Sequence, residues 1–88
     1  MRRIQLIDGR RMREDILAVR MRILRWLLAH KKPAMPTAIS RGARLTPRER
    51  LSVDFYLAYS WFTRMPTGYW PTPSGVAALK EHGSNRRR

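Results

Sequence analysis

Apolar residues recur at helical spacing over residues 12–30 and predict the longest helix of the chain. They cover more than half of the helix circumference, so we expect this helix to form the centre of the core. Arg20 falls inside the apolar arc, where it has to reach solvent or pair with a carboxylate, for which Asp54 is the candidate. The apolar positions are Met12, Ile16, Leu17, Val19, Met21, Ile23, Leu24, Trp26, Leu27 and Leu28.

A single continuous helix is predicted over residues 46–62. Thr46 can cap it, Pro47 suits the first helical position, and Glu49 can complete a capping box. Two apolar stripes follow, so the helix should pack from two sides and leave a narrow polar face. One stripe holds Leu51, Phe55, Ala58 and Phe62; the other holds Val53, Leu57 and Trp61. The free face carries Glu49, Ser52, Tyr56 and Ser60.

Shorter elements are predicted in the rest of the chain. Residues 36–43 should form a short helix with Ser40 turned outward, residues 63–70 a β-hairpin, and residues 72–82 a last helix that Gly83 ends. Residues 1–11 fit a basic arm or a short strand, and residues 83–88 a basic disordered tail. The predicted fold class is mainly α with a small β-hairpin, in one domain over residues 12–82.

Charge narrows the choice of partner. The 88 residues hold 19 basic and 6 acidic side chains, giving a net charge of +13, and 16 of the basic residues are arginine. Such a charge favours an anionic partner, most often nucleic acid, although arginine-rich codon usage and solvated tails can also produce it. Cysteine is absent and no apolar run is long enough for a membrane span, so we expect a cytoplasmic protein without membrane contact.

The predicted element order resembles the winged helix-turn-helix DNA-binding domain of bacterial and phage transcriptional regulators, over residues 12–82. The most specific segment is residues 69–79, YWPTPSGVAAL. It is similar to the family's ending Y-x-L-T-x-x-G, in which the return strand of the wing enters a final helix. Pro71 replaces the usual apolar strand residue and shortens that strand.

The resemblance implies a three-helix core, a short wing and a C-terminal helix. Residues 36–43 would be the first helix of the helix-turn-helix, residues 46–62 the recognition helix, and residues 63–70 the wing. The implied partner is duplex DNA, contacted mainly at the N-terminal end of the recognition helix. Arginine suits this role because its planar fork binds both phosphate and guanine edges. The candidate DNA-binding residues are Arg41, Arg44, Arg48, Arg50, Ser52 and Arg64.

Two other functions remain open. Aromatic residues are enriched at protein interfaces, so the same scaffold could bind a host protein, as a phage-encoded inhibitor or adaptor, or a second copy of itself. The candidate interface residues are Tyr56, Tyr59, Trp61, Tyr69 and Trp70, which could equally fill the core. Alternatively, Tyr69 and Trp70 beside Arg64 hint at RNA binding.

Catalytic motifs are missing from the sequence. It has two histidines, no cysteine, no HExxH and no glycine-rich phosphate loop, so we expect neither an enzyme nor a metal or cofactor site. The sequence does not specify the target DNA, activation or repression, or the oligomeric state.

Overall fold

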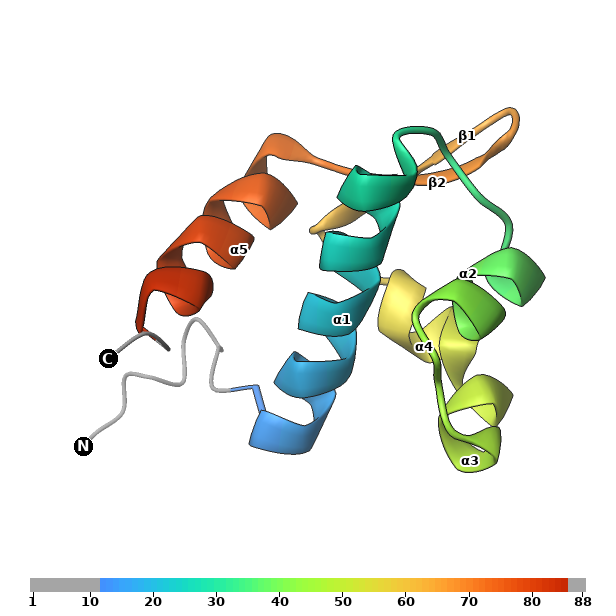
Figure 1. Cartoon of the computed structure of the whole chain (residues 1–88), viewed down its shortest axis with the longest axis horizontal. Helices are drawn as coiled ribbons and strands as arrows, with labels where there is room; N and C mark the ends of the chain where they lie inside the picture. Colours follow the sequence, from blue (N-terminus) through green and yellow to red (C-terminus); the bar gives the residue numbers. More distant parts are fainter. Residues whose placement is uncertain (1–11, 86–88) are drawn as a thin grey trace.

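The structure is a computed structural model that describes residues 12–85, with side chains described to residue 82. Five helices and one hairpin follow one another along the described chain (Figure 1). The strand or arm predicted for residues 1–11 and the last three residues of the predicted tail lie outside the described residues. The elements are α1 (Glu14–His30), α2 (Pro36–Gly42), α3 (Pro47–Leu51), α4 (Val53–Leu57), β1 (Phe62–Met65), β2 (Gly68–Pro71) and α5 (Pro73–Asn85).

Helix α1 is the centre of the molecule, as its wide apolar arc predicts. Its Ile23, Leu24 and Leu27 are fully buried. Helix α5 lies on one side of it, and α2, α3 and α4 lie on the other (Figure 1). The helix ends where Lys31 takes a left-handed conformation with φ 67° and donates its N–H to the Leu27 carbonyl. None of the described helices is both long and apolar enough to cross a membrane.

The helix predicted over residues 46–62 is wrong as a single element. It breaks at Ser52, whose φ of −111° and ψ of 19° separate α3 from α4, and α4 ends at Leu57. Because of the break, Leu51 is 88% exposed and Phe55 is 53% exposed, although both belong to a predicted buried stripe. Leu57, on the other stripe, is buried.

Arg20 explains where α4 ends. Its side chain is only 4% exposed and makes no ion pair with another described residue, so Asp54 is not its partner. Instead, Arg20 Nε donates to the Tyr56 carbonyl at 2.9 Å, and Nη2 donates to the Phe55 carbonyl at 3.2 Å. The guanidinium lies over the Tyr59 ring, 4.1 Å from its centroid. Backbone carbonyls and an aromatic face therefore hold this buried cation.

The predicted hairpin is confirmed, but the prediction that Pro71 shortens the return strand is wrong, because β2 includes Pro71 and pairs it with Phe62 of β1. Strands β1 and β2 pair antiparallel, from Phe62 opposite Pro71 to Met65 opposite Gly68. A single bridge adds Ala34 to β2: Tyr69 N donates to Ala34 O at 2.8 Å, and Ala34 N donates to Tyr69 O at 3.3 Å. The linker between α1 and α2 is thereby fixed to the hairpin.

The last helix begins where predicted and runs further than predicted. Thr72 Oγ1 accepts from the Gly75 N–H at 3.1 Å and donates to the Ser60 carbonyl at 2.7 Å, which joins the cap of α5 to the segment before β1. Gly83 does not end the helix, because α5 continues to Asn85, so residues 83–85 of the predicted disordered tail are helical. The predicted fold class is confirmed at the level of a small, mainly helical domain with one antiparallel hairpin.

Candidate nucleic-acid interface

The corner between α2 and α3 presents most of the predicted DNA-binding residues. Helix α2 ends at Gly42, Arg44 adopts a left-handed conformation with φ 57°, and Leu45 is buried, so the chain turns sharply into α3. The backbone of the turn is held by Leu45 N, which donates to the Ser40 carbonyl at 2.9 Å. Four arginines at this corner have exposed side chains: Arg41, Arg44, Arg48 and Arg50.

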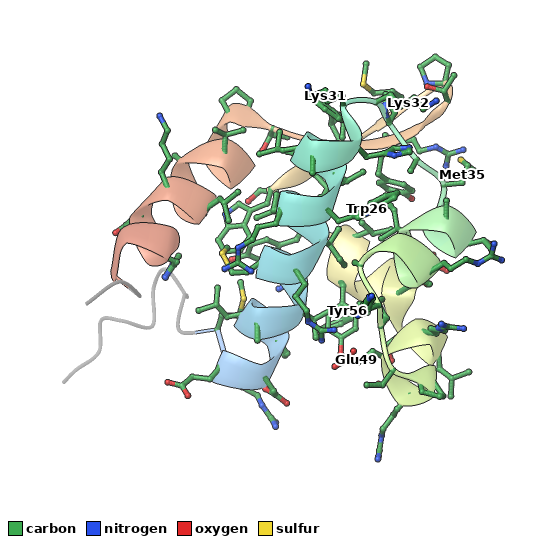
Figure 2. All side chains as sticks on the ribbon, in the orientation of Figure 1. Trp26, Lys31, Lys32, Met35, Glu49 and Tyr56 are labelled. Carbon is green, nitrogen blue, oxygen red and sulfur yellow. The ribbon has the colours of Figure 1, made fainter. Side chains whose placement is uncertain are left out.

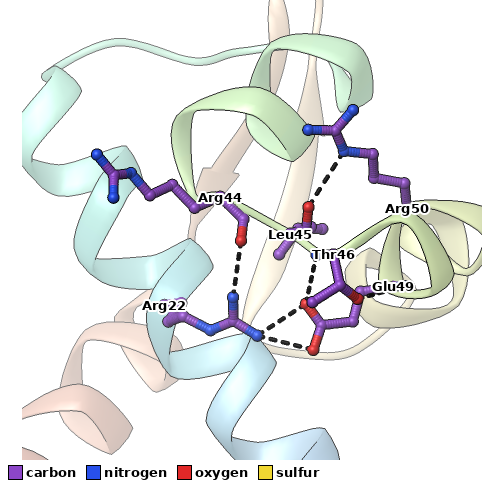
Figure 3. Close-up of polar contacts among 6 residues, drawn as sticks. All are labelled: Arg22, Arg44, Leu45, Thr46, Glu49 and Arg50. Carbon is purple, nitrogen blue, oxygen red and sulfur yellow. Dashed lines mark hydrogen bonds and ion pairs between the residues drawn. The ribbon is translucent and has the colours of Figure 1, made fainter.

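The capping box predicted at the start of α3 is confirmed. Glu49 N donates to Thr46 Oγ1 at 3.1 Å, and Thr46 N donates to Glu49 Oε1 at 2.9 Å (Figure 3). Arg22 of α1 also binds this carboxylate, with Nη2 at 2.9 Å from both oxygens. Burial raises the pKa of Glu49, but the hydrogen bonds from Thr46 and Arg22 outweigh it and leave the pKa below its ordinary value. Glu49 is therefore ionised and neutralised within the fold.

The arginines of this corner point in different directions. Arg22 Nη1 donates to the Arg44 carbonyl at 3.0 Å, which fixes the backbone of the turn. Figure 3 shows the guanidinium groups of Arg44 and Arg50 well separated from each other. Arg50 Nε donates to the Leu45 carbonyl at 3.2 Å, which orients its guanidinium toward α2.

Arg41 and Arg50 are brought together around a shallow groove of about 260 Å³ between α2 and the α3–α4 segment. Ser40 lines the same groove and is buried, so the prediction that it points outward is wrong. Arg44 and Arg48 do not line the groove. Ser52, the remaining candidate in this region, is exposed at the junction of α3 and α4.

The sixth candidate, Arg64, lies apart from this corner, on the hairpin. It is exposed, and its guanidinium carbon is 5.4 Å from the centroid of the Tyr69 ring on the opposite strand. In Figure 1 the hairpin and α3 lie at opposite ends of one side of the molecule, with α2 between them.

Sequence reasoning missed Lys31 and Lys32 as members of this surface, because it treated them only as cations at a helix end. Both are exposed, and they lie near the hairpin, as Figure 2 shows. The cause is the bridge between Ala34 and Tyr69, which brings the linker alongside β2. No local signal in the sequence reveals a pairing between residues so far apart.

The five aromatic residues proposed as a protein interface are all half-buried and pack against the core. The large apolar side chains that remain exposed among the described residues are others: Met35, Leu51, Phe55 and Met65. Figure 2 shows Tyr56 between α1 and α4, consistent with a packing role. The aromatic set therefore does not form a single exposed patch.

Metal ligands are not clustered in the described part of the chain, where no three residues of His, Cys, Asp or Glu come together. His30, at the end of α1, stacks on Trp26 with the ring centroids 4.4 Å apart and the planes at 17°.

Comparisons with protein-family models, curated proteins and solved structures found no match to this chain.

Proposed function

We propose that this protein binds duplex DNA through the surface formed by α2, α3 and the hairpin, as a small winged-helix transcriptional regulator of the cytoplasm. The observation that carries the proposal is the charge balance of this surface. Glu49, the carboxylate of α3, is neutralised by Arg22, whereas the arginines beside it are exposed. Seven exposed cations belong to the surface: Lys31, Lys32, Arg41, Arg44, Arg48, Arg50 and Arg64.

The element order supports a helix-turn-helix role for α2 and α3. In such domains the second helix enters the major groove with its N-terminal residues, while the first crosses the backbone. Arg48 lies in the first turn of α3 and Arg50 near its end, so both are available to phosphates or guanine edges. Because α3 stops at Leu51, base reading by this helix is limited to little more than one turn.

The hairpin would act as the wing, with Arg64 as its basic contact. Lys31 and Lys32 add charge near the hairpin, where the bridge between Ala34 and Tyr69 holds the linker against β2. DNA phosphates on either side of the major groove that α3 enters would then contact cations from both ends of the protein surface. Such contacts are independent of sequence and fix orientation rather than specificity.

Salt dependence tests the proposal directly. Each phosphate contact makes the slope of log K against log salt more negative by about 0.9 for duplex DNA. If all seven cations contact phosphates, the slope would be about −6, and fewer contacts would make it less steep. We would measure binding to duplex DNA and single-stranded RNA by fluorescence anisotropy at several salt concentrations. A steep slope with a clear preference for a duplex is expected.

Matched variants locate the contact surface. The double variant R44A/R48A should reduce the slope for duplex DNA by about 2, since two phosphate contacts are lost. The control R25A/K80A removes two exposed cations from α1 and α5 and should leave duplex affinity close to that of the wild type. Equal weak binding to every polyanion, or equal losses in both variants, would contradict the proposal. Preference for RNA, or capture of a protein after nuclease treatment, would favour the alternative functions.

A further inference from the structure

The groove between α2 and the α3–α4 segment has the composition of an anion site. Two arginines, Arg41 and Arg50, and two hydroxyl-bearing residues, Thr37 and Ser40, line about 260 Å³. Pro36 and Val53 supply the apolar part of its wall, and no carboxylate is among its lining residues. Charged donors and hydroxyl donors around one small concave space match the acceptors of a phosphate group.

Ser40 is the observation that points most specifically to a ligand. Ser40 lines the groove, and the residue is only 7% exposed. Its backbone carbonyl accepts from Leu45 N, but its hydroxyl makes no hydrogen bond to any other described residue. Buried hydroxyl groups normally have a partner, because leaving one without a partner is costly. A ligand oxygen in the groove would provide that partner.

Arg50 is held in a suitable orientation before any ligand arrives. Its Nε donates to the Leu45 carbonyl at 3.2 Å, and the guanidinium extends toward α2 (Figure 3). No described residue accepts from either of its terminal nitrogens, so both remain available to a ligand. A cation fixed by one of its own donors loses less conformational freedom on binding than a freely rotating side chain.

The groove is open to solvent, so a bound phosphate would keep part of its hydration shell. We infer that the groove lined by Thr37, Ser40, Arg41 and Arg50 binds one phosphate group, with the two hydroxyl groups and the two guanidinium groups as donors. The phosphate comes either from a DNA backbone, in which case the inference rests on the proposed function, or from a free phosphate compound.

The S40A variant separates a ligand role from a structural one. If the hydroxyl serves only a ligand, S40A should unfold at the same temperature as the wild type, or slightly higher, in a buffer without phosphate. Affinity for phosphate should fall about tenfold, the effect of losing one hydrogen bond to a charged group. T37V removes the second hydroxyl with little change of shape and serves as an independent variant if S40A is perturbed.

Two probes distinguish the sources of the phosphate. Inorganic phosphate would be titrated into the wild type, S40A, T37V and R50A, with amide shifts of Thr37 and Ser40 followed by NMR and sodium chloride as the ionic-strength control. Saturable shifts that weaken in the variants support a site for free phosphate. In the second arm, duplex DNA with single methylphosphonate replacements would be tested against the wild type and S40A. A position at which the neutral replacement and S40A weaken binding non-additively identifies a backbone phosphate in the groove.

The control variant R48A removes an exposed arginine that does not line the groove. If duplex binding depends on Arg48 but not on Ser40, Thr37 or Arg50, and inorganic phosphate gives no saturable shift, the groove assignment is overturned while the proposed function stands. If duplex DNA fails to bind but inorganic phosphate saturates the groove, the proposed function fails and the phosphate site stands.

Discussion

Arg20 Nε donates to the carbonyl oxygen of Tyr56 at 2.9 Å, across 36 positions of the chain, and Nη2 donates to the Phe55 carbonyl at 3.2 Å. Both carbonyls belong to the last turn of α4, where a continuing helix would supply backbone N–H donors. The Tyr59 N–H, which a regular helix would direct at Phe55, donates instead to the Leu57 carbonyl. Arg20 therefore replaces the missing helical turn and stabilises the end of α4.

Replacing Arg20 with lysine should lower the free energy of unfolding by about 2–3 kcal/mol, because two partly buried hydrogen bonds lose their well-placed charged donors. A lysine ammonium cannot reproduce the planar fork that lies over the Tyr59 ring. Burial lowers the pKa of Arg20, but the guanidinium remains charged at neutral pH. Urea unfolding at neutral pH measures the loss.

The control for this prediction is R25K, an exposed position on the same helix, where the change should stay within about 0.5 kcal/mol. Equal stability of R20K and the wild type would show that the guanidinium geometry is not needed to end α4.

Local signals in the sequence predict much of this fold. The apolar periodicity of α1, the Thr46 and Glu49 capping box, and the turn signals of the hairpin each act within a few residues, and all three are confirmed. The cap of Thr72 on α5 belongs to the same class. These features could be predicted because their physical causes lie within one or two turns of the chain.

Long-range contacts decide what the sequence could not reveal. Two apolar stripes over residues 46–62 are compatible with a continuous helix, and only the contact of Arg20 with Phe55 and Tyr56 shows where the helix ends. The burial of Ser40 and its place beside Arg50 depend equally on how α2 meets α3. The exposed arginines of the candidate interface were predictable by type, whereas their grouping was not.

Substituting alanine for Gly68 should detach the linker from the hairpin. Gly68 has φ of 143°, which side chains rarely allow, and a Cβ there would lie 2.4–2.6 Å from backbone atoms of Ala34. The backbone has to move, so we expect a loss of about 2–4 kcal/mol from strain and from the broken bridge to Tyr69. Hydrogen exchange at the Tyr69 amide, which donates to Ala34, should accelerate more than exchange in the middle of α1.

The matched substitution is T67A, at the exposed neighbouring position of the same turn. It should leave exchange at the Tyr69 amide unchanged. Similar exchange in G68A and T67A would mean that the close approach to Ala34 does not hold the linker in place.

Glu49 should make the stability of the domain depend on acid pH. Its folded pKa is lowered below the ordinary value of 4.5, despite the opposing effect of burial, by hydrogen bonds from Thr46 and Arg22. A group with a lowered folded pKa stabilises the fold in its ionised form. Its contribution is therefore present above pH 4.5 and is lost as the pH falls through the lowered folded value. Unfolding free energies measured from pH 7 downward should show this decrease.

The E49Q variant should show a smaller decrease below pH 4.5 than the wild type, because glutamine does not titrate. At neutral pH it should be less stable by about 1 kcal/mol, since it keeps the cap acceptor but loses the charge that Arg22 binds. E81Q, at an exposed position of α5, serves as the control and should retain the acid dependence of the wild type. An acid profile of E49Q identical to that of the wild type would rule out Glu49 as its source.

Leu51 and Leu57 give opposite expectations for the same substitution, and this difference tests the break at Ser52. In a continuous helix over residues 46–62 both leucines would lie on buried stripes, and both L51A and L57A would be costly. In the structure, Leu51 is exposed at the end of α3 and Leu57 is buried in the core. L51A should therefore change the free energy of unfolding by less than about 0.5 kcal/mol, whereas L57A should lower it by about 2–5 kcal/mol. Comparable losses in the two variants would restore the continuous helix.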